Sequence, residues 1–254
     1  MVSRVELNIG MFDVRQIADN LNLSPDGIWV APKSTDFAFL PDDETDWVQV
    51  QQHSFWYQHR NNCFKELFKN FSPSGVLLEV EAGDGFVSLG LQQSGIQVVA
   101  IEPDLKHARN AKRRGVENVI SAKIEDVEWK PGCVSGVGLF DVLEHVEDEI
   151  DFLRQIRHQL LKPSGRLYIS VPAYKWLWSK EDDEACHLRR YSMEMLRNRL
   201  KAAGFMIEYA TYFFSVLVVP IFFFRALPTR FGIRPDRTHL SSYREHNLKN
   251  SCGY

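Results

Sequence analysis

The sequence predicts an α/β protein in which helices cover both faces of a doubly wound, mostly parallel sheet. Short apolar runs without alternation, typical of strands buried on both faces, fall at residues 76–80, 98–101, 119–120, 134–140 and 167–171. Amphipathic stretches between and after them predict helices over residues 86–94, 105–114, 147–161 and 192–203. Right-handed crossovers between successive parallel strands would give a Rossmann-like fold.

The same patterns divide the chain into three regions. Residues 1–70 predict an N-terminal extension, irregular at first, which ends in an aromatic capping helix that starts near residue 46. Residues 71–211 predict the core, in which 205–212 would supply a sixth strand. Residues 212–254 predict an apolar segment followed by a tail.

The apolar segment spans residues 212–227 and reads YFFSVLVVPIFFFRAL. It is shorter than the ~20 residues that cross a bilayer, and Pro220 interrupts it, so burial is favoured over peripheral membrane contact. No strand-like run follows it. Either 215–224 forms the last strand, or the C-terminal strand hairpin is incomplete and its edge is covered by this segment or by the second subunit of a homodimer.

Composition narrows the function. The 254-residue chain has a formal net charge of −3, so no overall positive field predicts nucleic-acid binding. Its four cysteines form no CxxC pair, which leaves no signal for a cysteine zinc site. Residues 1–10 lack an apolar signal-peptide core, so a cytoplasmic location is expected.

A glycine-containing loop follows the first predicted core strand. This strand ends at Glu79-Val80 and runs into Glu81-Ala82-Gly83-Asp84-Gly85, at the edge of the sheet where such folds bind ligands. Glu102 closes the next strand at about the spacing where an acid binds ribose hydroxyls. Together they predict a nucleoside site. A nicotinamide dehydrogenase is disfavoured because Ser88 stands where its last glycine belongs.

The loop resembles motif I of class I S-adenosylmethionine-dependent methyltransferases, an acid followed by three alternate glycines. Glu79, Gly83 and Gly85 match that motif, and Glu81 replaces its first glycine. In the family this position lies near the methionine part of the cofactor. A glutamate there would weaken binding of the cofactor carboxylate unless it turns away or pairs with the cofactor ammonium.

Later segments extend this resemblance over about residues 45–210. Residues 121–126 resemble the adenine-binding segment, 140–146 (Phe-Asp-Val-Leu-Glu-His-Val) the motif after strand four, and 161–167 the turn into strand five. The resemblance implies S-adenosyl-L-methionine as cofactor and S-adenosyl-L-homocysteine as product. The implied cofactor-binding residues are Glu79, Glu81, Gly83, Gly85, Glu102, Pro103, Ile124, Glu125, Asp141 and Leu143.

Two further segments resemble type 11 and type 23-like bacterial small-molecule methyltransferases. They are Ser54 to Asn61 and Val171 to Ser192, the latter containing His187-Leu188-Arg189-Arg190-Tyr191. The resemblance places substrate contacts at Trp56, Arg60, Trp178, Arg189 and Tyr191.

Two histidines are the proton-handling candidates. An imidazole titrates near neutral pH, so His145 or His187 would serve as general base toward a hydroxyl acceptor. The alternatives are structural roles. His145 would hydrogen-bond backbone at the turn, and His187 would belong to a loop-anchoring network with Arg189 and Arg190. We expect one of these two arginines to pair with Asp182 or Asp183. No metal site is predicted, because the two histidines lack a third ligand at recognisable spacing. The sequence thus predicts methyl transfer to a small-molecule acceptor of lipid or saccharide type, with a binding or scaffolding protein of the same fold as the alternative.

Overall fold

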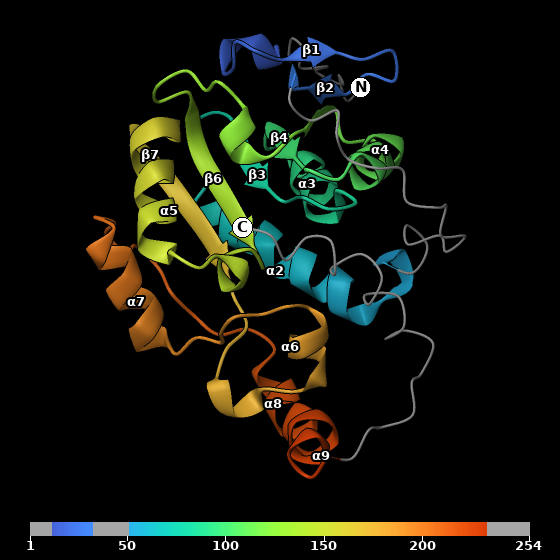
Figure 1. Cartoon of the computed structure of the whole chain (residues 1–254), viewed down its shortest axis with the longest axis vertical. Helices are drawn as coiled ribbons and strands as arrows, with labels where there is room; N and C mark the ends of the chain where they lie inside the picture. The colour runs from blue at the N-terminus through green and yellow to red at the C-terminus, as the bar shows by residue number, and fades with distance from the viewer. Residues whose placement is uncertain (1–11, 33–50, 233–254) are drawn as a thin grey trace, which may run out of the picture. The chain divides into compact units, whose positions relative to one another are not determined.

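The computed structural model describes residues 12–32 and 51–232 (Figure 1). The start of the predicted capping helix, at 46–50, and the tail from 233 lie outside the described residues. The chain forms two compact units that divide after Gly136.

The first unit carries the early strands and their helices. Its elements are the 3-10 turn η1 (Val14–Gln16), β1 (Asn22–Leu23), β2 (Trp29–Val30), α2 (Phe55–Asn70), β3 (Leu77–Val80), α3 (Phe86–Gln92), β4 (Val98–Ile101), α4 (Leu105–Arg114), β5 (Asn118–Ser121) and η3 (Ile124–Asp126).

Three parallel strands form the centre of this unit. β3 pairs with β4, and β4 with β5, and every residue of the three strands is buried. Burial on both faces explains why the sequence shows continuous apolar runs here. β2 adds to β5 in parallel, with Trp29 opposite Ile120, and β1 pairs antiparallel with β2. These two-residue strands are too short to produce a periodic pattern, so the irregular N-terminal interpretation missed them.

Helix α2 packs against α3. Asn61 donates from its amide to the Phe86 carbonyl at 2.8 Å, and Tyr57 meets the Phe86 ring edge to face. Phe64 and Phe68 are buried, as expected for core aromatics, whereas Phe55 is 68% exposed. The helix is therefore anchored along most of its length, from Tyr57 to Phe68, while its first residue faces solvent.

The second unit begins within β6, because the chain divides after Gly136. Its elements are β6 (Val134–Phe140), η4 (Leu143–His145), α5 (Glu149–Gln155), the π-helical turn η5 (Ile156–Leu160), β7 (Leu161–Ser170), η6 (Lys175–Leu177), α6 (Lys180–Glu184), α7 (Met193–Ala202), η7 (Ser215–Leu217), α8 (Val218–Ile221), η8 (Phe222–Ala226) and α9 (Leu227–Arg230).

The strand order β1-β2-β5-β4-β3-β6-β7 confirms the predicted doubly wound fold. The order reverses at β3, whose carboxyl end carries the glycine loop. The predicted sixth strand at 205–212 is wrong: these residues form no strand, and Met206 and Tyr209 are 94% and 55% exposed. Glu208 pairs with Arg166 of β7 through its side chain at 3.1 Å. Within the described residues no strand follows β7, so residues 215–224 do not form the last strand and the C-terminal strand hairpin is incomplete there.

The apolar segment forms the consecutive short helical turns η7, α8, η8 and α9 (Figure 1). The favoured interpretation, that it is buried, is wrong for four of its apolar side chains. Val216, Val219, Phe223 and Phe224 are 79%, 62%, 56% and 75% exposed. None of the helices in 12–32 or 51–232 has the length and apolarity needed to cross a membrane.

The segment attaches to the loops after β7 rather than lying along that strand. Arg230 donates to the Trp176 carbonyl at 2.8 Å, and Phe222 meets the Trp176 ring edge to face. The Lys180 amide donates to the Thr229 hydroxyl at 3.3 Å. These contacts hold one face of the segment and leave the other in solvent.

Candidate functional site

The loop after β3 has left-handed backbone at three alternate positions. Glu81, Gly83 and Gly85 have φ of 53°, 55° and 71°. Glycine adopts this region without strain, and a glutamate does so at a cost. The local backbone thus keeps the geometry of three alternate glycines although the first has been replaced.

The two glycines serve different ends. A Cβ on Gly83 would meet no described atom within 4 Å, so the loop is open at this point. A Cβ on Gly85 would lie 2.7 Å from the Ala111 side chain and 2.8 Å from Val116. Gly85 therefore allows close approach of α3 and α4, and Gly83 leaves backbone accessible to a ligand.

Glu102, at the end of β4, ties the loop to the neighbouring strand. Its carboxylate accepts from the Gly83 amide at 2.8 Å and from the Asp104 amide at 2.9 Å, and it is 8% exposed. Burial raises its pKa, against the lowering effect of the His107 charge and of these two hydrogen bonds. The acid predicted to bind ribose hydroxyls therefore also shapes the loop.

Glu79 lies inside the sheet and points to α3. It is 3% exposed, and its carboxyl accepts from the Ser88 hydroxyl at 2.5 Å. Burial raises its pKa to about 7, against the hydrogen bond from Ser88 and the nearby charge of Arg60. Two residues discussed above therefore lie near Glu79, the first acid of the motif. One is Arg60, a predicted substrate residue. The other is Ser88, which replaces the last glycine of the dehydrogenase motif.

Glu81 sits among other acids. Burial, followed by the charges of Glu102 and Glu125, raises its pKa to about 8 although Lys123 opposes them. The carboxyl ends of β3, β4 and β5 therefore bring together three predicted cofactor residues. A side chain with this pKa is largely protonated at neutral pH, which removes most of the expected repulsion of a cofactor carboxylate.

The remaining predicted cofactor residues of this unit flank that acidic group. Pro103 is half-buried between Glu102 and the N-terminus of α4. Ile124 is half-buried in η3, where its carbonyl accepts from the Trp129 indole at 2.8 Å. Glu125 is exposed in the same turn.

An ion pair that sequence reasoning missed secures the loop to α4. Asp84 is 7% exposed and accepts from His107 Nδ1 at 2.8 Å and from the Asn110 amide at 2.9 Å. Burial would lower the pKa of His107, but Asp84, with Glu102 and Asp104, raises it to about 9. Asp104 is the N-cap of α4, and its side chain accepts from the His107 amide, so His107 lies in the first turn of this helix. An N-cap acid followed by a histidine three residues later was the available signal.

The predicted substrate residues of α2 lie near its N-terminus. Trp56 is 39% exposed. Arg60 places its guanidinium 5.6 Å from the Tyr57 ring centroid and 5.8 Å from that of Phe64. Such stacking fixes the direction of the Arg60 side chain.

In the second unit, the turn after β6 starts at Asp141, whose φ is 61°. Its carboxylate accepts from the Ser170 hydroxyl at 3.0 Å, which links the ends of β6 and β7. Leu143 is fully buried in η4. Asp141 thus lies at the carboxyl end of β6, the edge of the sheet at which doubly wound folds bind ligands; cofactor binding by Asp141 and Leu143 stays a prediction.

Asp182 organises the loop that contains the predicted catalytic His187. It is 1% exposed and accepts from His187 Nδ1 at 2.8 Å, Arg190 Nε at 2.7 Å and the Ser179 amide at 2.8 Å. Burial would raise its pKa, but the hydrogen bonds from His187 and Arg190 lower it to about 2. The expected pairing of one adjacent arginine with an aspartate is confirmed for Arg190.

Arg189 and Tyr191 form a second network around Glu149. Arg189 pairs with the Glu149 carboxylate at 3.2 Å and donates to the Val146 carbonyl. The Tyr191 hydroxyl donates to the same carboxylate at 2.7 Å and lies 3.0 Å from the Leu143 carbonyl. Tyr191 is 2% exposed, and burial raises its pKa far above the ordinary value. These contacts anchor the loop; substrate binding by the two residues stays a prediction.

His145 and Trp178 complete the predicted set. The ring centroids of His145 and His187 lie 5.1 Å apart at an interplanar angle of 70°. Trp178 donates from its indole to Asp183 at 2.9 Å and is half-buried. The structure therefore brings the two predicted catalytic histidines together, although 42 residues separate them.

Comparison with known proteins agrees with this geometry. Residues 55–210 match the model of a family described as Methyltransferase domain. Among solved structures, Haemonchus contortus phosphoethanolamine N-methyltransferase 2, in complex with phosphomonomethylethanolamine and S-adenosylhomocysteine, superposes with a TM-score of 0.50 at 18% identity, covering 77% of this chain and 49% of that one. A SAM-dependent methyltransferase of Thermotoga maritima has a TM-score of 0.49 at 20% identity, covering 63% and 75%. No curated protein matches significantly.

The fold and the family match define a methyltransferase domain. Because the family model covers more than half of the chain, this chain belongs to the Methyltransferase domain family.

Proposed function

We propose that this chain binds S-adenosyl-L-methionine and transfers its methyl group to a small-molecule acceptor, releasing S-adenosyl-L-homocysteine. The observation that carries the proposal is the loop from Glu79 to Gly85, which keeps left-handed backbone at 81, 83 and 85 and an open surface at Gly83. These residues fit the cofactor: accessible backbone lies beside Glu102, an acid suited to ribose hydroxyls.

When bound, the cofactor supplies an electrophilic methyl group on a sulfonium. The protein then has to orient the acceptor, exclude water and receive the acceptor's proton. In the second unit, His145 and His187 are the predicted groups for that proton, and Asp182 fixes the His187 ring through Nδ1. For the acceptor we propose a small molecule of lipid or saccharide type.

Calorimetry with S-adenosylhomocysteine tests the cofactor half of the proposal. Gly83→Ala should abolish binding, because the new methyl group would occupy the open surface of the loop. Gly95→Ala is the matched control, since Gly95 has φ of 87° and likewise no described atom within 4 Å of an added Cβ. Equal binding by both variants, or none by the wild type, contradicts the proposed site.

A binding protein without turnover is the second candidate, and the half-buried, strained Glu81 in place of a glycine favours it. Formation of S-adenosylhomocysteine from S-adenosylmethionine in the presence of candidate acceptors separates the two. Tight binding with no product across acceptor classes supports the non-catalytic function.

A further inference from the structure

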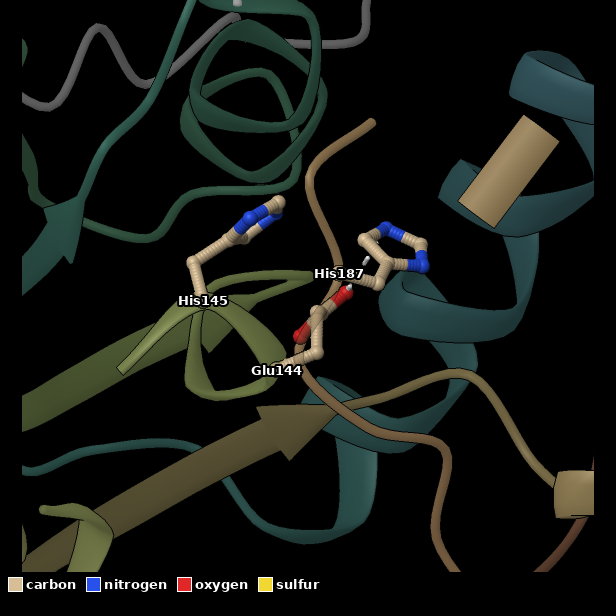
Figure 2. A group of neighbouring side chains, drawn as sticks. All are labelled: Glu144, His145 and His187. Atoms are coloured by element: carbon tan, nitrogen blue, oxygen red, sulfur yellow. Dashed lines mark ion pairs between the residues drawn. The ribbon is translucent and has the colours of Figure 1, made fainter. Parts of the chain in front are cut away.

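Three potential metal ligands meet in the second unit. One ligand atom each from Glu144, His145 and His187 lies within 4.8 Å of the others. Glu144 and His145 come from the turn η4 after β6, and His187 comes from the loop before α7 (Figure 2). The Leu188 amide donates to the Glu144 carbonyl at 2.9 Å, which fixes the loop beside the turn. Sequence reasoning missed Glu144 as the third ligand, because an acid directly next to a histidine is not one of the ligand spacings typical of metal sites.

The direction of the His187 ring is set from behind. Asp182 accepts at 2.8 Å from Nδ1, and its carboxylate, held ionised by Arg190 as well, can only accept. Nδ1 therefore carries a proton, and Nε2 is the ring nitrogen that faces Glu144. A carboxylate behind a histidine in this way is the usual outer support of a metal ligand.

The front of the cluster is held by a long ion pair and not by a hydrogen bond (Figure 2). His187 Nε2 and Glu144 Oε1 lie 3.9 Å apart, beyond hydrogen-bond distance. Metal–nitrogen and metal–oxygen bonds of about 2.0–2.2 Å put two ligand atoms of a tetrahedral ion about 3.3–3.6 Å apart, so only a small movement is needed to bind an ion here. The Glu144 side chain is fully buried, where an anion is stabilised by a close positive charge or a metal.

We propose that Glu144, His145 and His187 bind one divalent transition-metal ion, for which Zn²⁺ is the probe. Two imidazoles and one carboxylate suit Zn²⁺ or Fe²⁺, whereas Mg²⁺ prefers oxygen ligands. The ligand atoms all lie within 4.8 Å of one another, so side-chain movements of less than about 1 Å bring them to a bonded arrangement. Three protein ligands leave coordination positions for water or for an oxygen of the acceptor. In the bound state the histidines act as ligands and no longer as bases.

The test is zinc binding by the untagged full-length protein, after removal of metal with a chelator. Competition with a chromophoric chelator should give one Zn²⁺ per chain. Glu144→Gln and His187→Ala should each lower the affinity at least tenfold, and Asp182→Asn about 10–100-fold as an outer support. Circular dichroism of each variant checks that it is folded, and Glu144→Gln keeps the shape of the side chain.

Two controls locate the ion. His158→Ala removes an exposed imidazole of η5 and should leave the affinity unchanged. Cys63→Ser/Cys133→Ser removes two thiols and should also bind as the wild type. The proposal is overturned if wild-type protein binds less than one Zn²⁺, if folded Glu144→Gln and His187→Ala bind as tightly as wild type, if the cysteine variant loses the ion, or if Mg²⁺ competes as an equal. Cofactor calorimetry on the metal-free protein is a separate measurement, so failure of either site is distinguishable.

Discussion

Glu81 offers the sharpest test of how this structure stores free energy. It combines two unfavourable features: left-handed backbone with φ of 53°, and a half-buried carboxyl whose pKa is raised to about 8 from 4.5. The backbone strain costs about 1 kcal/mol relative to glycine. The carboxyl keeps its proton in the folded state over a pH range where the unfolded chain has lost it.

The sign of the pH effect follows from that proton. The pKa of the Glu81 carboxyl is higher in the folded than in the unfolded chain. The contribution of Glu81 to the free energy of unfolding is therefore most favourable below pH 4.5, and it falls as the pH rises toward 8. At about 1.4 kcal/mol per pKa unit, the loss reaches at most about 3 kcal/mol at pH 7, and less where solvent screens the group. Glu81→Gln removes this loss and keeps the strained backbone. Glu81→Gly removes both.

Urea unfolding at pH 5, 6, 7 and 8 measures both contributions. The free energy of unfolding of Glu81→Gln minus that of the wild type should grow steadily with pH. Glu81→Gly should exceed Glu81→Gln by about 1 kcal/mol at every pH. A difference between Gln and wild type that does not change with pH would refute the electrostatic argument, and equal stability of Gly and Gln would refute the strain argument.

Three other substitutions follow from the geometry. The pKa of His107 is raised to about 9 from 6.5, so its pairing with Asp84 stabilises the fold fully below pH 6.5 and is lost as the pH rises through 9. The free energy of unfolding of His107→Gln should be about 3 kcal/mol lower than that of the wild type at pH 6, and this difference should shrink by pH 10. A difference that does not change with pH contradicts this account. Gly85→Ala should lower the free energy of unfolding by about 2–4 kcal/mol, because φ is 71° and the new Cβ would lie 2.7 Å from a side chain of α4; chemical denaturation checks it, and a loss below 1 kcal/mol would show that the helices adjust. Phe223→Ser/Phe224→Ser should reduce co-sedimentation with lipid vesicles without changing thermal stability, because both side chains are exposed; equal sedimentation of variant and wild type would contradict membrane contact.

The core of the fold was predictable because its strands are buried on both faces. Leu77–Val80, Val98–Ile101 and Val134–Phe140 produce continuous apolar runs that the sequence displays directly. Residues 205–212 contain β-forming side chains as well, but propensity does not show whether a neighbouring strand is present to pair with them. The exposed face of the 212–227 segment was missed for the same reason: apolarity alone does not tell what covers it.

The site was predictable to the extent that one backbone segment defines it. The loop from Glu79 to Gly85 and the acid Glu102 were found from spacing alone. The Asp84–His107 pair, the Asp182 network and the Glu144 position depend on side chains that come together only after folding. Such contacts leave no periodic trace in a single sequence.

The two short N-terminal strands have a consequence for the order in which the protein folds. β2 pairs in parallel with β5, and this pairing joins Trp29 to Ile120 across about ninety residues of chain. Loop closure over such a separation is slow, and β5 has to be in place before β2 has an edge to join. Hydrogen-exchange protection at Trp29 should therefore develop after that of β4, and this edge should be among the first parts of the sheet to open in native conditions.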